Sequence, residues 1–144
     1  DNLSLTERQK RIVNNLFYSV SDIERIGDHA ENMAEQAEYL VQHKLDFTET
    51  GMRDLKNISD SVIQSFQYAI NARQTGNMDS VRKVSQYEDD VDNQEEALRE
   101  KHIERLSAGR CEPSAGVVFL DILSNLERIS DHAYNIAGYV KDEL

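Results

Sequence analysis

The chain has 144 residues, which is enough for one domain with a buried core. Its formal net charge of −11 argues against nucleic-acid binding, because such surfaces place basic side chains opposite phosphates. The same charge suits cations or a basic partner surface. No run of about 18 apolar residues occurs, so no segment is expected to span a membrane. With one Pro and six Gly, little interrupts regular structure, and we expect a single all-α domain over residues 1–144.

The first predicted helix covers about residues 4–43. Ser4 and Glu7 stand three residues apart, as in a capping box that starts a helix. The apolar residues expected to face the core form one stripe: Ile12, Leu16, Val20, Ile23, Ala30, Ala34, Ala37 and Val41.

Three more helices follow, over about 49–74, 77–107 and 113–143. Gly76 and Gly109 supply C-terminal stops, Asn77 an N-cap, and Pro113 a first-turn proline. Short connections favour antiparallel neighbours, so we predict an up-down-up-down four-helix bundle. A coiled-coil homodimer is a further possibility, although the apolar stripes are wider than a two-position seam.

A repeat links the first and fourth helices. Residues 21–34 read SDIERIGDHAENMA and residues 124–137 read SNLERISDHAYNIA, with nine of fourteen positions identical at an offset of 103. Core packing alone would preserve the apolar positions and let the polar ones drift. Because the polar residues repeat, we predict a duplicated site.

Three Glu-x-x-x-Asp pairs are the candidate metal ligands: Glu24 with Asp28, Glu88 with Asp92, and Glu127 with Asp131. A spacing of four residues sets two side chains about 40° apart on a helix, one turn along, so both can reach one ion. Each pair lies near the middle of its helix, so we expect the first, third and fourth helices to form sites in one layer. Carboxylate ligands favour hard cations such as iron, manganese, magnesium or calcium.

Other residues of the repeat are weaker candidates. His29 and His132 directly follow the aspartates and lie about 100° around the helix from them, so both are poor ligands for the same ion. Asn32 and Asn135 continue the four-residue spacing and are candidates to hold the ligands in place, as are the two histidines. Arg25 and Arg128 offer a metal-free alternative, in which they neutralise carboxylates of neighbouring helices.

A di-iron enzyme and a metal-free interaction module are the two alternatives to a metal-binding regulator. A di-iron enzyme of the ferritin-like kind uses Glu-x-x-His, and none of the four histidines has Glu three residues before it. No phosphate-binding glycine loop, nucleophile elbow or HExxH motif occurs, so we expect no enzyme. A metal-free helical interaction module stays open as an alternative.

The repeated segments IERIGDHAENMAE (23–35) and LERISDHAYNIAG (126–138) resemble the hallmark motif of the PhoU family. Residues 105–137 look most like the soluble C-terminal domain of bacterial sodium/phosphate cotransporters of this family. The resemblance departs at Ser130, where Gly27 and most members have glycine, and at Gly138, which stands where Glu35 ends the first motif.

The resemblance implies bundles with three helices per repeat. The first helix would then close a preceding repeat, and the other three would form a complete one. It also implies carboxylate-bound metal, iron first, with zinc, manganese or magnesium as alternatives. The implied role is regulation of phosphate uptake in the cytoplasm, tethered to the inner membrane in a cotransporter, with a transporter portion or transport-system proteins as partners. A stand-alone PhoU-like regulator is the alternative.

Overall fold

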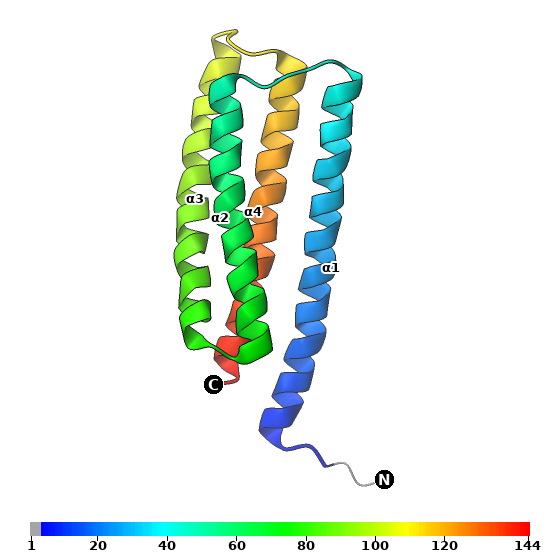
Figure 1. The fold of residues 1–144 in the computed structure, drawn as a ribbon, viewed down its shortest axis with the longest axis vertical. Coiled ribbons are helices and arrows are strands. Elements are labelled where there is room, and N and C mark those ends of the chain that lie inside the picture. The colour runs from blue at the N-terminus through cyan, green and yellow to red at the C-terminus, as the bar shows by residue number, and fades with distance from the viewer. Residues whose placement is uncertain (1–3) are drawn as a thin grey trace.

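The computed structural model describes residues 4–144 and contains four long helices, which run alternately up and down (Figure 1). They are α1 (Glu7–Gln42), α2 (Glu49–Thr75), α3 (Met78–Ser107) and α4 (Pro113–Asp142). Within residues 4–144 there is no strand, so the predicted all-α, up-down-up-down fold is confirmed. None of these helices combines the length and the apolar character that crossing a membrane requires.

The start of α1 differs from the prediction. Thr6, not Ser4, is the N-cap: its hydroxyl accepts a hydrogen bond from the Gln9 N–H, and the Gln9 side chain accepts one from the Thr6 N–H. The sequence offers two overlapping capping boxes, Ser4 with Glu7 and Thr6 with Gln9. The structure uses the second.

The other predicted helix ends are confirmed. Gly76 and Gly109 follow α2 and α3 with φ of 71° and 69°, a left-handed conformation that glycine adopts without a Cβ clash. The Asn77 side chain caps α3, and Pro113 lies in the first turn of α4. There the Glu112 carboxylate accepts a hydrogen bond from the backbone of the first turn.

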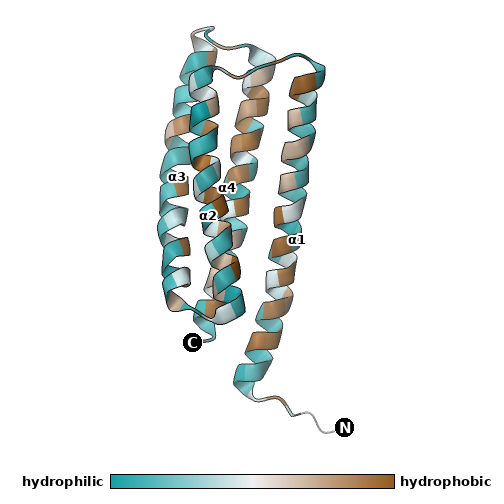
Figure 2. Ribbon diagram, in the orientation of Figure 1, coloured by the Kyte–Doolittle hydropathy of each residue, from teal (hydrophilic) through white to brown (hydrophobic). Residues whose placement is uncertain are grey.

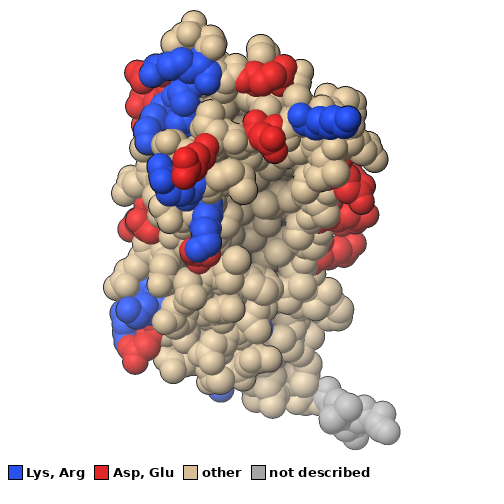
Figure 3. Space-filling model, turned by 45° about the horizontal axis from the view of Figure 1, so that its top comes forward, with Lys and Arg blue, Asp and Glu red and all other residues tan. Residues whose placement is uncertain are grey.

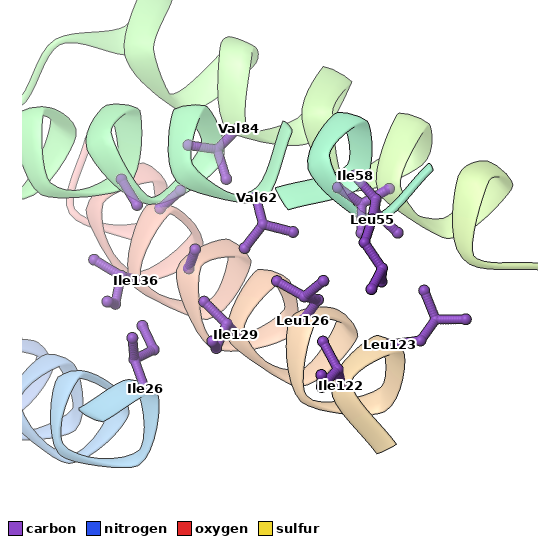
Figure 4. Packing of buried hydrophobic residues seen from close by; sticks show 14 of the residues in the cluster. Ile26, Leu55, Ile58, Val62, Val84, Ile122, Leu123, Leu126, Ile129 and Ile136 are labelled. Atoms are coloured by element: carbon purple, nitrogen blue, oxygen red, sulfur yellow. The ribbon is translucent and has the colours of Figure 1, made fainter. Parts of the chain in front are cut away.

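The core lies between α2, α3 and α4, each of which contacts the other two (Figure 4). Its fully buried members include Ile58 of α2, Val84 and Val91 of α3, and Phe119 and Leu123 of α4. Apolar residues that recur at helical spacing on α2 and α3 therefore face the core. Burial of each such side chain stabilises the fold by about 1.5–3 kcal/mol.

Helix α1 is attached differently, because within residues 4–144 it contacts α4 and neither α2 nor α3. Figure 1 shows α1 well apart from α2 in the upper half of the molecule, with the gap narrowing toward the lower end of α2. An apolar groove of about 340 Å³ lies between them, with Ile26 and Met33 of α1 on one side and Val62 and Phe66 of α2 on the other. In this four-helix bundle α2, α3 and α4 thus pack mutually, and α1 is attached along α4.

The predicted core stripe of α1 is wrong. Leu16, Val20 and Ile23 are 45%, 62% and 40% exposed, and Ala30, Ala34, Ala37 and Val41 are exposed too. Hydrophobic residues recur along α1 in Figure 2. The buried residues of α1 are instead Asn15, Ser19, Asp22 and Ile26. The apolar spacing correctly predicted an amphipathic helix. It could not show that the polar face of α1 packs against α4.

Candidate metal centre

Three carboxylates converge where α3 packs on α4. Glu88 and Asp92 lie one turn apart on α3, and Asp131 projects from α4. One oxygen from each lies within 4.8 Å of the others. Like charges at this separation repel unless a proton or a cation lies between them.

Glu88 is the most perturbed of the three. Its burial raises its pKa to about 7, as do a hydrogen bond with Asp131 and the charges of Asp92 and Asp131. The Ser130 hydroxyl donates to Glu88 Oε2 at 2.7 Å, which opposes the rise without cancelling it. Burial and Asp131 also raise the pKa of Asp92. Without a bound cation, the negative charges of these three carboxylates are not balanced by nearby positive charges among residues 4–144.

Glu127 extends the cluster along α4. Burial raises its pKa first, followed by the charges of Glu95 and Asp131. Glu95 is the residue that the predicted ligand set lacked, although it shares the inward face of its helix with Glu88. Arg99 donates to Glu95 at 2.6 Å, but no other Lys or Arg forms an ion pair with these carboxylates in residues 4–144. Glu95 has no Asp four residues later in the sequence, so the Glu-x-x-x-Asp motif does not include it.

These residues fit a metal ion. The donors are carboxylate oxygens, some of them partly buried, and their raised pKa values mark a site where a bound cation would relieve repulsion. Oxygen donors select hard cations such as magnesium, manganese or iron. Glu88, Asp92 and Asp131 would hold the ion, and a ligand role for Glu127 stays a prediction.

Glu24 and Asp28 lie elsewhere. They are exposed on α1 and line a cavity between α1 and α4, together with Arg25 and Arg128. Because α1 and α3 make no contact within residues 4–144, Glu24 and Asp28 do not join the α3–α4 cluster, and the expectation of one shared layer stays a prediction. A metal-binding role for Glu24 and Asp28 stays a prediction, and it needs ligands other than those of α3.

The repeated histidines and asparagines lie in the contact between α1 and α4. The His132 ring donates from Nδ1 to Asp22 Oδ1 at 2.7 Å, and Asn135 donates to the same oxygen at 3.3 Å. Tyr139 donates its hydroxyl to Asp22 Oδ2 at 2.8 Å. Burial, then this carboxylate, raises the pKa of Tyr139 to about 12.

A matching cluster forms at the other end of the same contact. The His29 ring donates from Nδ1 to Asn125 Oδ1 at 3.0 Å, and Asn32 approaches the same oxygen at 3.4 Å. Asn125 in turn donates to Gln36 Oε1 at 3.3 Å. The rings of His29 and His132 stack with centroids 5.8 Å apart.

The two clusters are related by the offset of 103 found in the sequence: Asp22 matches Asn125, His29 matches His132, Asn32 matches Asn135 and Gln36 matches Tyr139. Helices α1 and α4 therefore pack about a pseudo-two-fold axis, with each helix offering the same face to the other. This contact explains the repeated His and Asn residues through helix packing. It leaves the repeated Glu and Asp residues to be explained by a site.

The alternative in which Arg25 and Arg128 neutralise carboxylates of neighbouring helices is not supported by ion pairs. Neither Arg25 nor Arg128 lies within ion-pair distance of a carboxylate in the described part of the chain, although seven other Lys and Arg residues do.

The chain is thus an all-α helical bundle with a carboxylate cluster where α3 packs on α4. The PhoU domain model matches residues 55–140, which is more than half of the chain. The chain belongs to the PhoU family.

Relatives agree with this assignment. The chain is 29% identical over 133 residues to the phosphate-specific transport system accessory protein PhoU homolog 1 of Thermotoga maritima, with 92% of this chain and 56% of that protein covered. It is 34% identical over 134 residues to the PhoU homolog of Pseudomonas aeruginosa, with 90% and 53% covered. The crystal structure of PhoU from Pseudomonas aeruginosa superposes with a TM-score of 0.90 at 27% identity, over 99% of this chain and 67% of that one. The chain spans about half the length of the curated relatives it matches.

Proposed function

We propose that this chain binds metal at the α3–α4 carboxylates and serves as a regulatory domain of a phosphate uptake system. The observation that carries the metal proposal is the convergence of Glu88, Asp92 and Asp131 within 4.8 Å. Iron is the first candidate ion, with manganese, magnesium or zinc as alternatives. When bound, the ion would join α3 to α4 and set the spacing between them.

The names of the relatives support the phosphate connection, since each is called an accessory protein of phosphate-specific transport. They favour a stand-alone cytoplasmic regulator over our first expectation, the C-terminal domain of a sodium/phosphate cotransporter. The proposed partners are transport-system proteins. A membrane-spanning region encoded in the same gene would reverse this preference.

The exposed stripe of α1 supports the proposed division into repeats. Phe119, Leu123 and Leu126 of α4 are 1%, 0% and 3% exposed beneath α2 and α3. At the offset of 103, their counterparts on α1 are Leu16, Val20 and Ile23, all exposed. We propose that α1 closes a preceding repeat whose two helices cover this stripe, and that α2–α4 is a complete repeat. A homodimer that buries the same stripe is the competing arrangement, and sedimentation of the 144-residue chain separates the two.

The division also predicts that residues 45–144 fold alone. Helices α2, α3 and α4 contact one another mutually, whereas α1 contacts only α4. A fragment of residues 45–144 is expected to be helical by circular dichroism and to unfold in one cooperative transition. A non-cooperative, weakly helical fragment would contradict the proposed repeat.

Function is tested in a strain that lacks the gene. We expect the wild-type gene to restore normal control of phosphate uptake and the Glu88→Gln, Asp131→Asn double variant to fail. Glu96→Gln with Asp121→Asn is the matched control, because both residues are exposed on the same two helices and outside the cluster. Full restoration by the double variant would show that regulation does not need this site.

A further inference from the structure

A polar cavity lies between α1 and α4, and none of the α3–α4 carboxylates lines it. Its volume is about 660 Å³. Polar residues line it: Ser21, Glu24, Arg25, Asp28, His29, Arg128 and His132. Both members of two repeat-related pairs are present, Arg25 with Arg128 and His29 with His132, so the cavity lies at the pseudo-two-fold axis.

The two arginines have free guanidinium groups. Neither forms an ion pair in the described part of the chain, in which Asp and Glu outnumber Lys and Arg. A guanidinium presents five N–H donors in a planar fork that matches the oxygens of a carboxylate or a phosphate. Two such forks on facing helices can bind one anion from opposite sides.

The histidines give this cavity a fixed wall. Each ring is held by its own hydrogen bond, His29 to Asn125 at 3.0 Å and His132 to Asp22 at 2.7 Å, and the two rings stack. The helices that carry the arginines are therefore held together at this level by paired contacts. Such support keeps facing groups in place before a ligand arrives.

We propose that this cavity binds a phosphate group between Arg25 and Arg128, as the free ion or as a monoester. The assignment goes beyond the metal centre, since it concerns a different pair of helices and requires no ion at Glu88. Glu24 and Asp28 line the same cavity and repel a bare anion. A cation held by these two carboxylates would strengthen anion binding, and by linkage the anion would strengthen cation binding equally.

The test uses the 144-residue chain in chelator-treated buffer, titrated with inorganic phosphate and, in a second arm, with phenyl phosphate. Calorimetry gives the dissociation constant. Glu24→Gln with Asp28→Asn is expected to tighten phosphate binding roughly tenfold, because two repulsive charges are removed. In that background, Arg25→Gln or Arg128→Gln is expected to weaken it about tenfold, and Arg25→Lys less, since the charge remains without the fork.

Arg53→Gln is the control, because Arg53 is an exposed α2 residue far along the chain from this contact. Circular dichroism verifies that each variant folds. Equal phosphate affinity with and without the two arginines would overturn the proposal, as would no saturable binding in the Glu24→Gln, Asp28→Asn variant. Tighter binding of phenyl phosphate would identify a monoester as the ligand, and equal or weaker binding the free ion. Glu88→Gln with Asp131→Asn leaves phosphate affinity unchanged if the two sites are independent, so failure of one proposal is distinguishable from failure of the other.

Discussion

Replacement of Glu88 by Gln gives a test in which stability and metal binding change in opposite directions. Glutamine mimics the protonated acid: it can still accept the Ser130 hydrogen bond and can donate to Asp131. Without metal, the substitution removes a half-buried negative charge from among like charges. We therefore expect the variant to be more stable than the wild type at alkaline pH.

The size of the effect follows from the pKa. Burial and the neighbouring carboxylates raise the pKa of Glu88 from 4.5 to about 7. The stability that the protonated group contributes is complete below about pH 4.5 and is lost as the pH rises through about 7. The full difference corresponds to about 3 kcal/mol. Because Glu88 is only partly buried, solvent screens part of it, and we expect about 1–2 kcal/mol.

Urea unfolding with chelator at about pH 5 and about pH 8 measures this difference. Glu88→Gln is expected to match the wild type more closely at the lower pH and to exceed it at the higher. Addition of manganese should then stabilise the wild type and not the variant. Glu96→Gln, an exposed change on the same helix, should alter neither result. If Glu88→Gln is as unstable as the wild type at the higher pH, the carboxylates do not repel one another as inferred.

Three further predictions concern the helix contacts. Arg73→Met should destabilise the chain by about 3–5 kcal/mol in urea unfolding, because Glu143, 7% exposed, loses its ion-pair partner at 2.6 Å and keeps only the hydrogen bond from Asn15. A loss below about 1 kcal/mol would contradict this. Asp22→Ala removes the acceptor for three side chains of α4, so hydrogen exchange should accelerate in α1 and hardly in α2, and uniform acceleration would argue against a separately attached α1. The repeat-related pair Val20→Ala and Leu123→Ala should differ, with a cost within about 0.5 kcal/mol for the exposed residue and about 2–5 kcal/mol for the buried one; similar costs would mean that another surface covers α1.

Local signals in the sequence predicted most of the helix ends. Gly76, Asn77 and Pro113 act through their own backbone or side-chain chemistry, so their effect can be read without a partner. The predicted start of α1 was wrong only because two capping boxes overlap in the sequence, one starting at Ser4 and one at Thr6.

The face of α1 could not be predicted in the same way. Periodicity identifies an apolar stripe but not which neighbour covers it. Here the polar face of α1, with Asp22 and His29, packs against α4, while the apolar stripe that contains Val20 stays exposed. The repeat correctly pointed to a duplicated arrangement, but His and Asn repeat because two helices pack symmetrically.

The site was predicted in part for a related reason. The four-residue spacing picked out Glu88 with Asp92 and Glu127 with Asp131, and the structure brings Asp131 of α4 to the α3 pair. The spacing could not show that Glu24 and Asp28 stay outside this cluster, because that depends on the absence of contact between α1 and α3 in residues 4–144. The predicted ligand set left out Glu95, because its place beside the cluster follows from proximity to Glu127 across two helices.

The central claim is that the α3–α4 carboxylates bind a metal ion, and anomalous scattering from crystals grown with iron or manganese tests it most directly. We predict an anomalous peak among Glu88, Asp92 and Asp131 that is absent in crystals of the Glu88→Gln, Asp131→Asn variant. An anomalous map without a peak at these carboxylates, in crystals whose metal content is verified by elemental analysis, would contradict the account.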